Sequence, residues 1–191
     1  MQKSDFWTNA AKEGGVVGVL LAASMLFENY AFLSGSVGLM GLMMVEWIAV
    51  VVLHYWLLHR YTKRYGQQFP VEEGFPFGRA YSYVLILSIF AGVILGLVQA
   101  IYLHGIIGYE EYMTNYVNSI QELVSNSAAS AQMAPMMKQM MAQLEAASTP
   151  SVLQTAWGAV TNSVLFGGLF GLIIAAVVSR NARPFAPKEE E

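Results

Sequence analysis

Residues 152–179 read VLQTAWGAVTNSVLFGGLFGLIIAAVVS and contain no Asp, Glu, Lys, Arg or His. A helix needs about 20 mostly apolar residues to cross the hydrocarbon core of a bilayer. Three further stretches are as apolar as this one, so the predicted spans are residues 14–33, 37–58, 80–103 and 152–179. The sequence therefore predicts a single all-α membrane domain over residues 1–191, built as a bundle of four transmembrane helices.

The composition excludes several classes of function. Only 12% of the 191 residues are charged, whereas about 25% are charged in a typical soluble domain. The net charge of -3 gives none of the basic surface that binds nucleic acid. The absence of cysteine excludes disulfides, thiolate metal sites and cysteine nucleophiles. The partner that composition does imply is the lipid bilayer.

The Lys and Arg residues predict the orientation of the spans. Of the ten in the chain, all but Lys138 fall on one side of a four-span topology. Because basic residues are retained on the cytoplasmic side, both termini and the loop 59–79 are predicted to be cytoplasmic. The insert 104–151 is then extracytoplasmic. A cleavable signal peptide at the first span is disfavoured, because Glu28 and Asn29 interrupt the region where cleavage would occur.

Small residues recur at every fourth position in three of the predicted spans. Lipid provides no hydrophobic drive between helices, so close approach through small residues matters for packing. The abundance of glycine in membrane helices would explain one such pair, but hardly pairs in three helices. We expect a tight bundle whose packing glycines are Gly14, Gly18, Gly92, Gly96, Gly167 and Gly171.

The insert carries two amphipathic patterns at helical spacing and is predicted to form a helical hairpin. The first pattern comprises Tyr112, Tyr116, Ile120, Leu123 and Val124, and the second comprises Met133, Met136, Met137, Met140, Met141 and Leu144. Thioethers can bind Cu(I), but no histidine or cysteine lies near this methionine stripe. Packing against a partner helix or the lipid interface is therefore the favoured interpretation. The sequence predicts neither a metal site nor a cofactor.

The most informative residues are polar side chains inside the spans. A charge in the bilayer interior costs at least ~2.5 kcal/mol, so such residues are usually paired or functional. Depth in the bilayer can be counted at 1.5 Å per residue along a helix. Each span then contributes one polar residue to the outer half of the bilayer, and the four residues lie at two depths. The candidate intramembrane cluster is Glu28, Glu46, Gln99 and Asn162.

Two interpretations of this cluster remain open. No basic residue lies in the spans to pair with the carboxylates, so they are expected to be protonated or open to water. In one interpretation, neutral carboxyl groups form interhelical hydrogen bonds and only stabilise the bundle. In the other, the cluster is a proton- or ligand-binding pocket open to the outer face. No catalytic motif is found anywhere in the chain.

The chain resembles a bacterial family of small inner-membrane proteins, the domain of unknown function 4199. The resemblance rests on FPFGRA at residues 75–80, which leads directly into the third span, and on the final span ending in VVSR at residues 177–180. Family members often have lysine where this chain has Arg79. The acid-containing first hairpin and the Met- and Glu-bearing insert are similar too. The resemblance implies four spans in the bacterial inner membrane, and no activity, cofactor or catalytic residue.

Two functions follow as expectations. The first is a non-enzymatic accessory or scaffold subunit whose insert or cytoplasmic loop contacts a protein partner or a second copy of the chain. The second is a small transporter or proton-linked channel that uses Glu28 and Glu46. Four spans are few for alternating access, which favours the first, whereas the unpaired carboxylates favour the second. An intramembrane enzyme ranks third because no nucleophile, base or metal set is present.

Overall fold

The computed structural model describes residues 3–125, 135, 139, 142 and 149–182. The named elements within these residues are all helical: α1 (Lys3–Leu33), α2 (Val37–Gly66), α3 (Phe77–Ala100), η1 (Ile101–Ile107), α4 (Tyr109–Ser125) and α6 (Val152–Val178). Four helical segments are long and apolar enough to cross a membrane, namely Phe6–Leu33, Gly38–Gly66, Phe77–Ile107 and Val152–Val178. The all-α class and the four membrane helices are thus confirmed. Of the second helix of the expected hairpin, the structure describes only Pro135, Gln139 and Ala142, which are helical, and the methionine stripe lies outside the described residues.

The helices extend beyond the predicted spans. α1 begins at Lys3 rather than residue 14, and α2 continues to Gly66 rather than ending at residue 58. Hydropathy detects only the apolar part of a helix, whereas the hydrogen-bonded backbone continues until a residue interrupts it. α3 passes directly into the π-helical η1, which ends at Gly108 with φ 89°. Side-chain-bearing residues rarely adopt that conformation, so glycine is required where the chain turns into α4.

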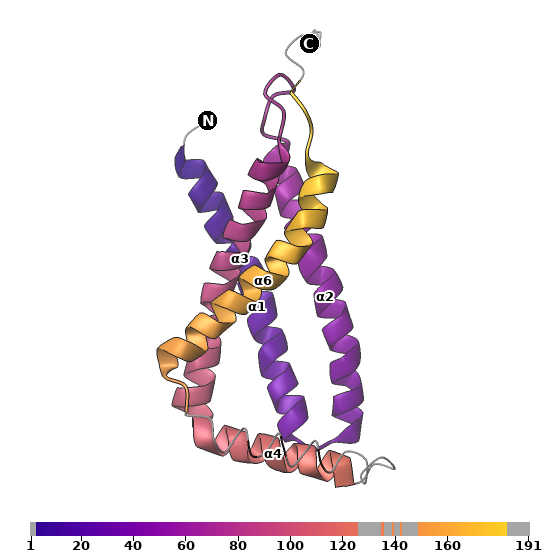
Figure 1. Cartoon of the computed structure of the whole chain (residues 1–191), viewed down its shortest axis with the longest axis vertical. Helices are drawn as coiled ribbons and strands as arrows, with labels where there is room; N and C mark the ends of the chain where they lie inside the picture. Colours follow the sequence, from indigo (N-terminus) through magenta and orange to yellow (C-terminus); the bar gives the residue numbers. More distant parts are fainter. Residues whose placement is uncertain (1–2, 126–134, 136–138, 140–141, 143–148, 183–191) are drawn as a thin grey trace.

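The described ends of the chain lie together at one end of the bundle, and α4 lies across the opposite end (Figure 1). We call these the terminal end and the α4 end. The most extensive contacts between helices join α3 with α6 and α1 with α3, and α2 has smaller contacts with its neighbours. α1 and α6 therefore flank α3, whereas much of α2 remains exposed.

Glycines allow the backbones of the packed helices to approach closely. A Cβ atom added to Gly96 would lie 2.5 Å from the carbonyl oxygen of Ala156 in α6, and one added to Gly14 would lie 2.6 Å from that of Leu87 in α3. Side-chain-bearing residues do not make such contacts without displacing the neighbouring helix. The structure places the other four glycines in comparable contacts: Gly18 against Ala91 and Ile94, Gly92 against Val160, Gly167 against Ser88, and Gly171 against Tyr81 and Val84.

At the terminal end, the segment after α6 is bound to the loop that follows α2. Phe75 and Arg180 form an antiparallel bridge in which each backbone N–H donates to the other residue's carbonyl oxygen at 2.9 Å. The Arg180 guanidinium also donates to the carbonyl oxygens of Gly66 and Phe69. Gly74 has φ 67°, and a Cβ atom there would lie 2.5 Å from the backbone nitrogen of Ala182. The contact between this loop and the segment after α6 therefore requires glycine at residue 74, both for its positive φ and because a side chain would not fit there.

At the α4 end, α4 is held against the last turns of α1. The Tyr112 hydroxyl donates to Oδ1 of Asn29 at 2.8 Å, and the Tyr116 ring stacks on Phe32 with centroids 4.7 Å apart. Burial raises the pKa of the Tyr112 hydroxyl to about 12. The opposite face of the helix is polar and exposed, with Glu110, Glu111, Thr114, Asn115, Asn118 and Gln121. An amphipathic helix placed across the ends of spans is typical of a segment in the membrane interface.

Candidate functional site

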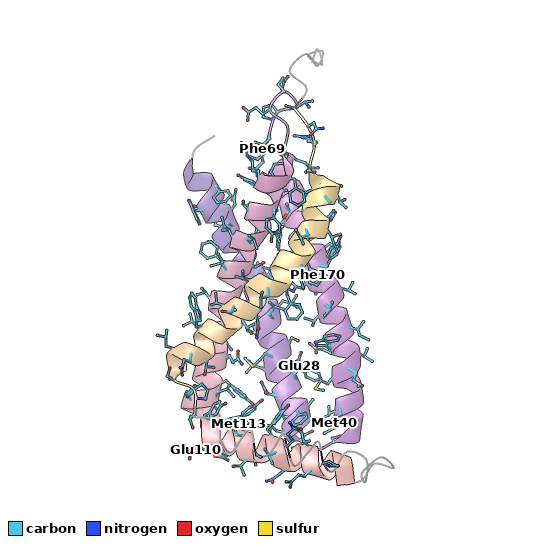
Figure 2. All side chains as sticks on the ribbon, in the orientation of Figure 1. Glu28, Met40, Phe69, Glu110, Met113 and Phe170 are labelled. Carbon is cyan, nitrogen blue, oxygen red and sulfur yellow. The ribbon has the colours of Figure 1, made fainter. Side chains whose placement is uncertain are left out.

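The structure brings together two members of the candidate cluster, Glu28 of α1 and Glu46 of α2. Both side chains are half-buried, and their charges are close enough to interact. The Ser24 hydroxyl donates to Oε1 of Glu28 at 3.0 Å. Glu28 lies in the half of α1 that is nearer α4 (Figure 2). Neither carboxylate has an ion-pair partner within the described part of the chain.

The other two members of the cluster are placed differently. Gln99 is half-buried on α3, and Asn162 is exposed on α6. Within the described residues, neither side chain hydrogen-bonds to Glu28 or Glu46. α6 instead turns Ser163 toward α3, where its hydroxyl donates to the carbonyl oxygen of Ser88 at 2.8 Å. A shared site of all four residues therefore stays a prediction.

A second feature involves buried polar atoms of α2. Among the described residues, three buried side-chain atoms have no hydrogen-bond partner: Oε2 of Glu46, Nε2 of His54 and Oγ1 of Thr62. All three residues belong to α2 and are spaced eight residues apart. Successive members are therefore about 12 Å apart along the helix axis and about 80° apart around it. We call Glu46, His54 and Thr62 the α2 polar line.

The three members of the polar line face different directions, because Glu46 and Thr62 are about 160° apart around α2. Glu46 interacts electrostatically with Glu28 of α1, and the His54 ring makes an edge-to-face contact with Phe170 of α6 at 5.5 Å between centroids. His54 is only 6% exposed, and Thr62 is fully buried. Leaving a buried polar group unpaired costs about 1–3 kcal/mol, so such groups normally have a partner, often an ordered water. An ordered water bound at each of these atoms would supply the missing partner.

A third group of polar residues, at the terminal end, is fully paired. Glu13 of α1 is 6% exposed; one carboxylate oxygen forms an ion pair with Arg64 of α2. The other oxygen accepts a hydrogen bond from the buried Tyr83 hydroxyl of α3 at 2.6 Å. The Tyr83 ring stacks on Tyr65 with centroids 4.1 Å apart. We call Glu13, Arg64, Tyr65 and Tyr83 the terminal-end cluster, and it links three helices.

Sequence reasoning missed the terminal-end cluster. The first span was predicted to begin at Gly14, so Glu13 fell outside the predicted spans. The usable signal was helical spacing, because Glu13 lies four residues before Val17 and so on the same face of α1 as that buried residue. The pairing with Arg64 bridges residues far apart in sequence, and spacing alone gives no indication of it.

The arrangement of His104 and of the acidic residues does not indicate a metal site in the described part of the chain. His104 of η1 hydrogen-bonds to Oγ1 of Thr155 at 2.8 Å and stacks on Tyr109, so it joins η1 to α6 and to α4. In the described residues, no group of three His, Cys, Asp or Glu side chains is arranged to hold a metal ion. The titratable residues of interest are therefore Glu46 and His54 of the polar line, together with Glu28.

Comparison with known proteins gives one family assignment. No curated protein and no solved structure matches the chain. The profile of the family described as "Protein of unknown function (DUF4199)" matches residues 12–180. The match begins next to Glu13, ends at Arg180 and includes the α2 polar line. Because this covers most of the chain, the protein belongs to the DUF4199 family.

Proposed function

We propose that this protein is a non-enzymatic membrane protein that transfers protons along the α2 polar line. The observation that carries the proposal is that the unpartnered buried atoms of Glu46, His54 and Thr62 all lie on one helix. Carboxyl and imidazole groups accept and release protons, and a hydroxyl both donates and accepts hydrogen bonds. The sequence left a proton-linked role as the alternative to an accessory subunit, and this geometry favours it.

Water would have to connect the members of the polar line. The separation of about 12 Å between neighbours corresponds to roughly four hydrogen bonds of about 2.8 Å each. Protons would then move between water and side-chain oxygen or nitrogen atoms, with no covalent step. Glu28, close to Glu46, would serve as the entry group on the α4 side, because two carboxylates without a basic partner can hold a proton between them.

The proposal is tested with the purified chain in vesicles that contain a pH-sensitive dye. An imposed pH gradient should decay faster with the protein than in empty vesicles, and Glu46→Gln should return the rate to that of empty vesicles. Glu110→Gln is the matched control, because Glu110 is exposed on α4 and away from the polar line. If Glu46→Gln conducts as well as the parent chain, the proposal fails.

A second variant tests the middle of the polar line. His54→Phe keeps an aromatic ring against Phe170 but removes both titratable nitrogens. It should fold normally and slow proton transfer, because the path then lacks its central proton acceptor. Full activity of a folded His54→Phe variant would confine the function to Glu28 and Glu46.

We also propose a bacterial inner-membrane location with both termini in the cytoplasm. The described basic residues gather at the terminal end and include Lys12, Arg60, Lys63, Arg64, Arg79 and Arg180, which supports this orientation. Single cysteines can be introduced at exposed positions because the chain has none of its own. An impermeant thiol reagent added from outside should label Asn118→Cys in α4 but not Glu72→Cys. Equal labelling of both would contradict the four-span topology.

An accessory or scaffold role remains the second candidate, favoured by the exposed polar face of α4. That face is held in a fixed position by the Tyr112–Asn29 hydrogen bond, which would suit recognition of a protein outside the membrane or of a second copy of the chain. The two roles differ in one experiment. Under the accessory role, the purified chain alone transfers no protons, and substitutions on the α4 polar face impair cellular function more than Glu46→Gln does.

A further inference from the structure

A pocket at the terminal end lies between the last turns of α2 and the end of α6. Its volume is about 280 Å³, and the residues that line it include His59, Lys63, Val177, Val178 and Arg180. We propose that this pocket binds the phosphate-bearing headgroup of an anionic phospholipid. The inference is independent of the proton-transfer proposal, because the pocket contains none of the residues of the α2 polar line.

The first argument is charge. Three basic side chains line the pocket, two from α2 and one that follows α6. Within the described residues, none of them forms an ion pair. Arg180 donates to the carbonyl oxygens of Gly66 and Phe69, which fix its position without neutralising its charge. Arg64, by contrast, is next to Lys63 in sequence but is paired with Glu13, and it does not line the pocket.

The second argument is depth in the bilayer. Aromatic residues concentrate at the membrane–water interface, and Trp56 marks this level on α2, with the Arg60 guanidinium 5.0 Å above its ring. Lys63 lies seven residues further along α2, which is about 10 Å beyond Trp56. The pocket therefore lies in the headgroup layer. In the topology proposed above, this is the cytoplasmic leaflet, where basic clusters bind anionic lipids.

The third argument distinguishes a lipid from a soluble phosphate. Val177 lines the pocket and is 65% exposed, and Ile173 and Leu169 continue the same exposed row toward the membrane centre, at 56% and 63%. Residues four apart lie nearly above one another on a helix, so this row forms an apolar stripe that leads away from the pocket. An acyl chain would cover such a stripe, whereas a soluble anion would leave it unused.

The size of the pocket agrees with a headgroup. Sites for drug-sized ligands typically measure about 300–1,000 Å³, and this pocket of about 280 Å³ falls just below that range. Each basic residue near an anionic surface strengthens binding by about fivefold. Removing the Lys63 charge and the His59 imidazole should therefore weaken lipid binding measurably while Arg180 keeps its structural hydrogen bonds.

The test uses the full chain in nanodiscs of phosphatidylcholine, with or without added phosphatidylglycerol. Phosphatidylglycerol should raise the Tm of the parent chain, and native mass spectrometry should show retained phosphatidylglycerol. Lys63→Gln should weaken retention about fivefold, and the combination with His59→Gln should abolish the rise in Tm. Lys12→Gln is the matched control, because Lys12 is an exposed basic residue at the same end of the bundle that does not line the pocket.

Three results would overturn the assignment. The first is a Lys63→Gln variant that keeps the full response to phosphatidylglycerol. The second is a Lys12→Gln variant that loses as much as Lys63→Gln, because the effect would then be general surface charge. The third is an equal rise in Tm when inorganic phosphate is added in phosphatidylcholine nanodiscs, because the pocket would then take a soluble anion. Should the double variant fail to fold, His59→Gln alone tests the same site.

Discussion

Two acids, the buried Glu13 at the terminal end and the half-buried Glu46 toward the α4 end, have opposite surroundings. Glu13 pairs with Arg64 and accepts a hydrogen bond from Tyr83, so both carboxylate oxygens have partners. Glu46 has one buried oxygen without a partner among the described residues, and it interacts electrostatically with another acid, Glu28. A paired carboxylate holds helices together, whereas an unpaired one is available for proton chemistry.

The packing around the two acids also differs, because the bundle is more tightly packed around Glu13 than around Glu46. The continuous core of buried residues lies around the terminal half of the bundle, where the rings of Phe6, Tyr65, Phe75 and Tyr83 contact one another. Toward the α4 end, α2 exposes large apolar side chains, including Met44, Val45, Trp47 and Ile48. The terminal half is therefore expected to be rigid, and the α4 half depends mainly on the contact between α3 and α6.

The largest expected effect is at that contact. Gly96→Leu forces a side chain into the 2.5 Å space before the carbonyl oxygen of Ala156 and should lower the free energy of unfolding by about 3 kcal/mol. Gly158→Leu is the matched control, because a Cβ atom on Gly158 meets nothing within 4 Å. Thermal unfolding in detergent measures both. Equal Tm values for the two variants would mean that the α4 half does not rely on this contact.

The next largest effect is at Glu13. Glu13→Leu leaves the buried Tyr83 hydroxyl and Arg64 without their acceptor, so the free energy of unfolding should fall by about 2 kcal/mol. Glu13→Gln keeps an acceptor for Tyr83 and should lose less. Chemical denaturation in mixed micelles measures the difference. If Glu13→Leu is as stable as the parent chain, the terminal-end cluster does not stabilise the bundle.

These contrasts also show which features of the fold the sequence could predict. The long apolar runs and the recurring glycines are local patterns, and they were sufficient to predict four helices. The motifs at residues 75–80 and 177–180 were sufficient to predict the family. Helix bounds were less accurate, because residues 59–66 are too polar to be recognised as part of a span yet continue α2 on the packed side, where Thr62 and Tyr65 are buried. Hydropathy responds to lipid exposure and not to helix length.

Site prediction was limited by rotation and by long-range pairing. Counting residues gives depth along a span, and the structure places Glu28 and Glu46 close enough for their charges to interact. Counting gives no rotation about the helix axis, and the structure leaves Asn162 exposed, so a site shared by all four residues stays a prediction. His54 was not predicted as a site residue, and its place in the polar line became visible once the packing of α2 on α6 was known.

A smaller effect is expected where α4 joins α1. Tyr112→Phe removes the hydrogen bond to Asn29 but keeps the ring, so the free energy of unfolding should fall by about 1 kcal/mol. The pKa of Tyr112 is about 12 in the folded chain and 10.0 ordinarily. The contribution of this pKa difference to the free energy of unfolding is fully present below pH 10 and is lost as the pH rises toward 12. The parent chain should therefore lose more stability over this range than Tyr112→Phe, as measured by thermal unfolding at each pH.

The smallest expected effect on stability is at Glu46, and it would sharpen the comparison most. Glu46→Gln replaces a carboxyl that lacks a partner for one oxygen with a group of the same shape, so the free energy of unfolding should change by less than about 0.5 kcal/mol. Glu13→Gln, the same chemical change in a paired acid, should lose about 1 kcal/mol. Proton transfer should respond in the opposite order, lost in Glu46→Gln and kept in Glu13→Gln. If Glu46→Gln is the more destabilised of the two, then Glu46 has a structural partner, and the distinction between the paired and the unpaired acid does not hold.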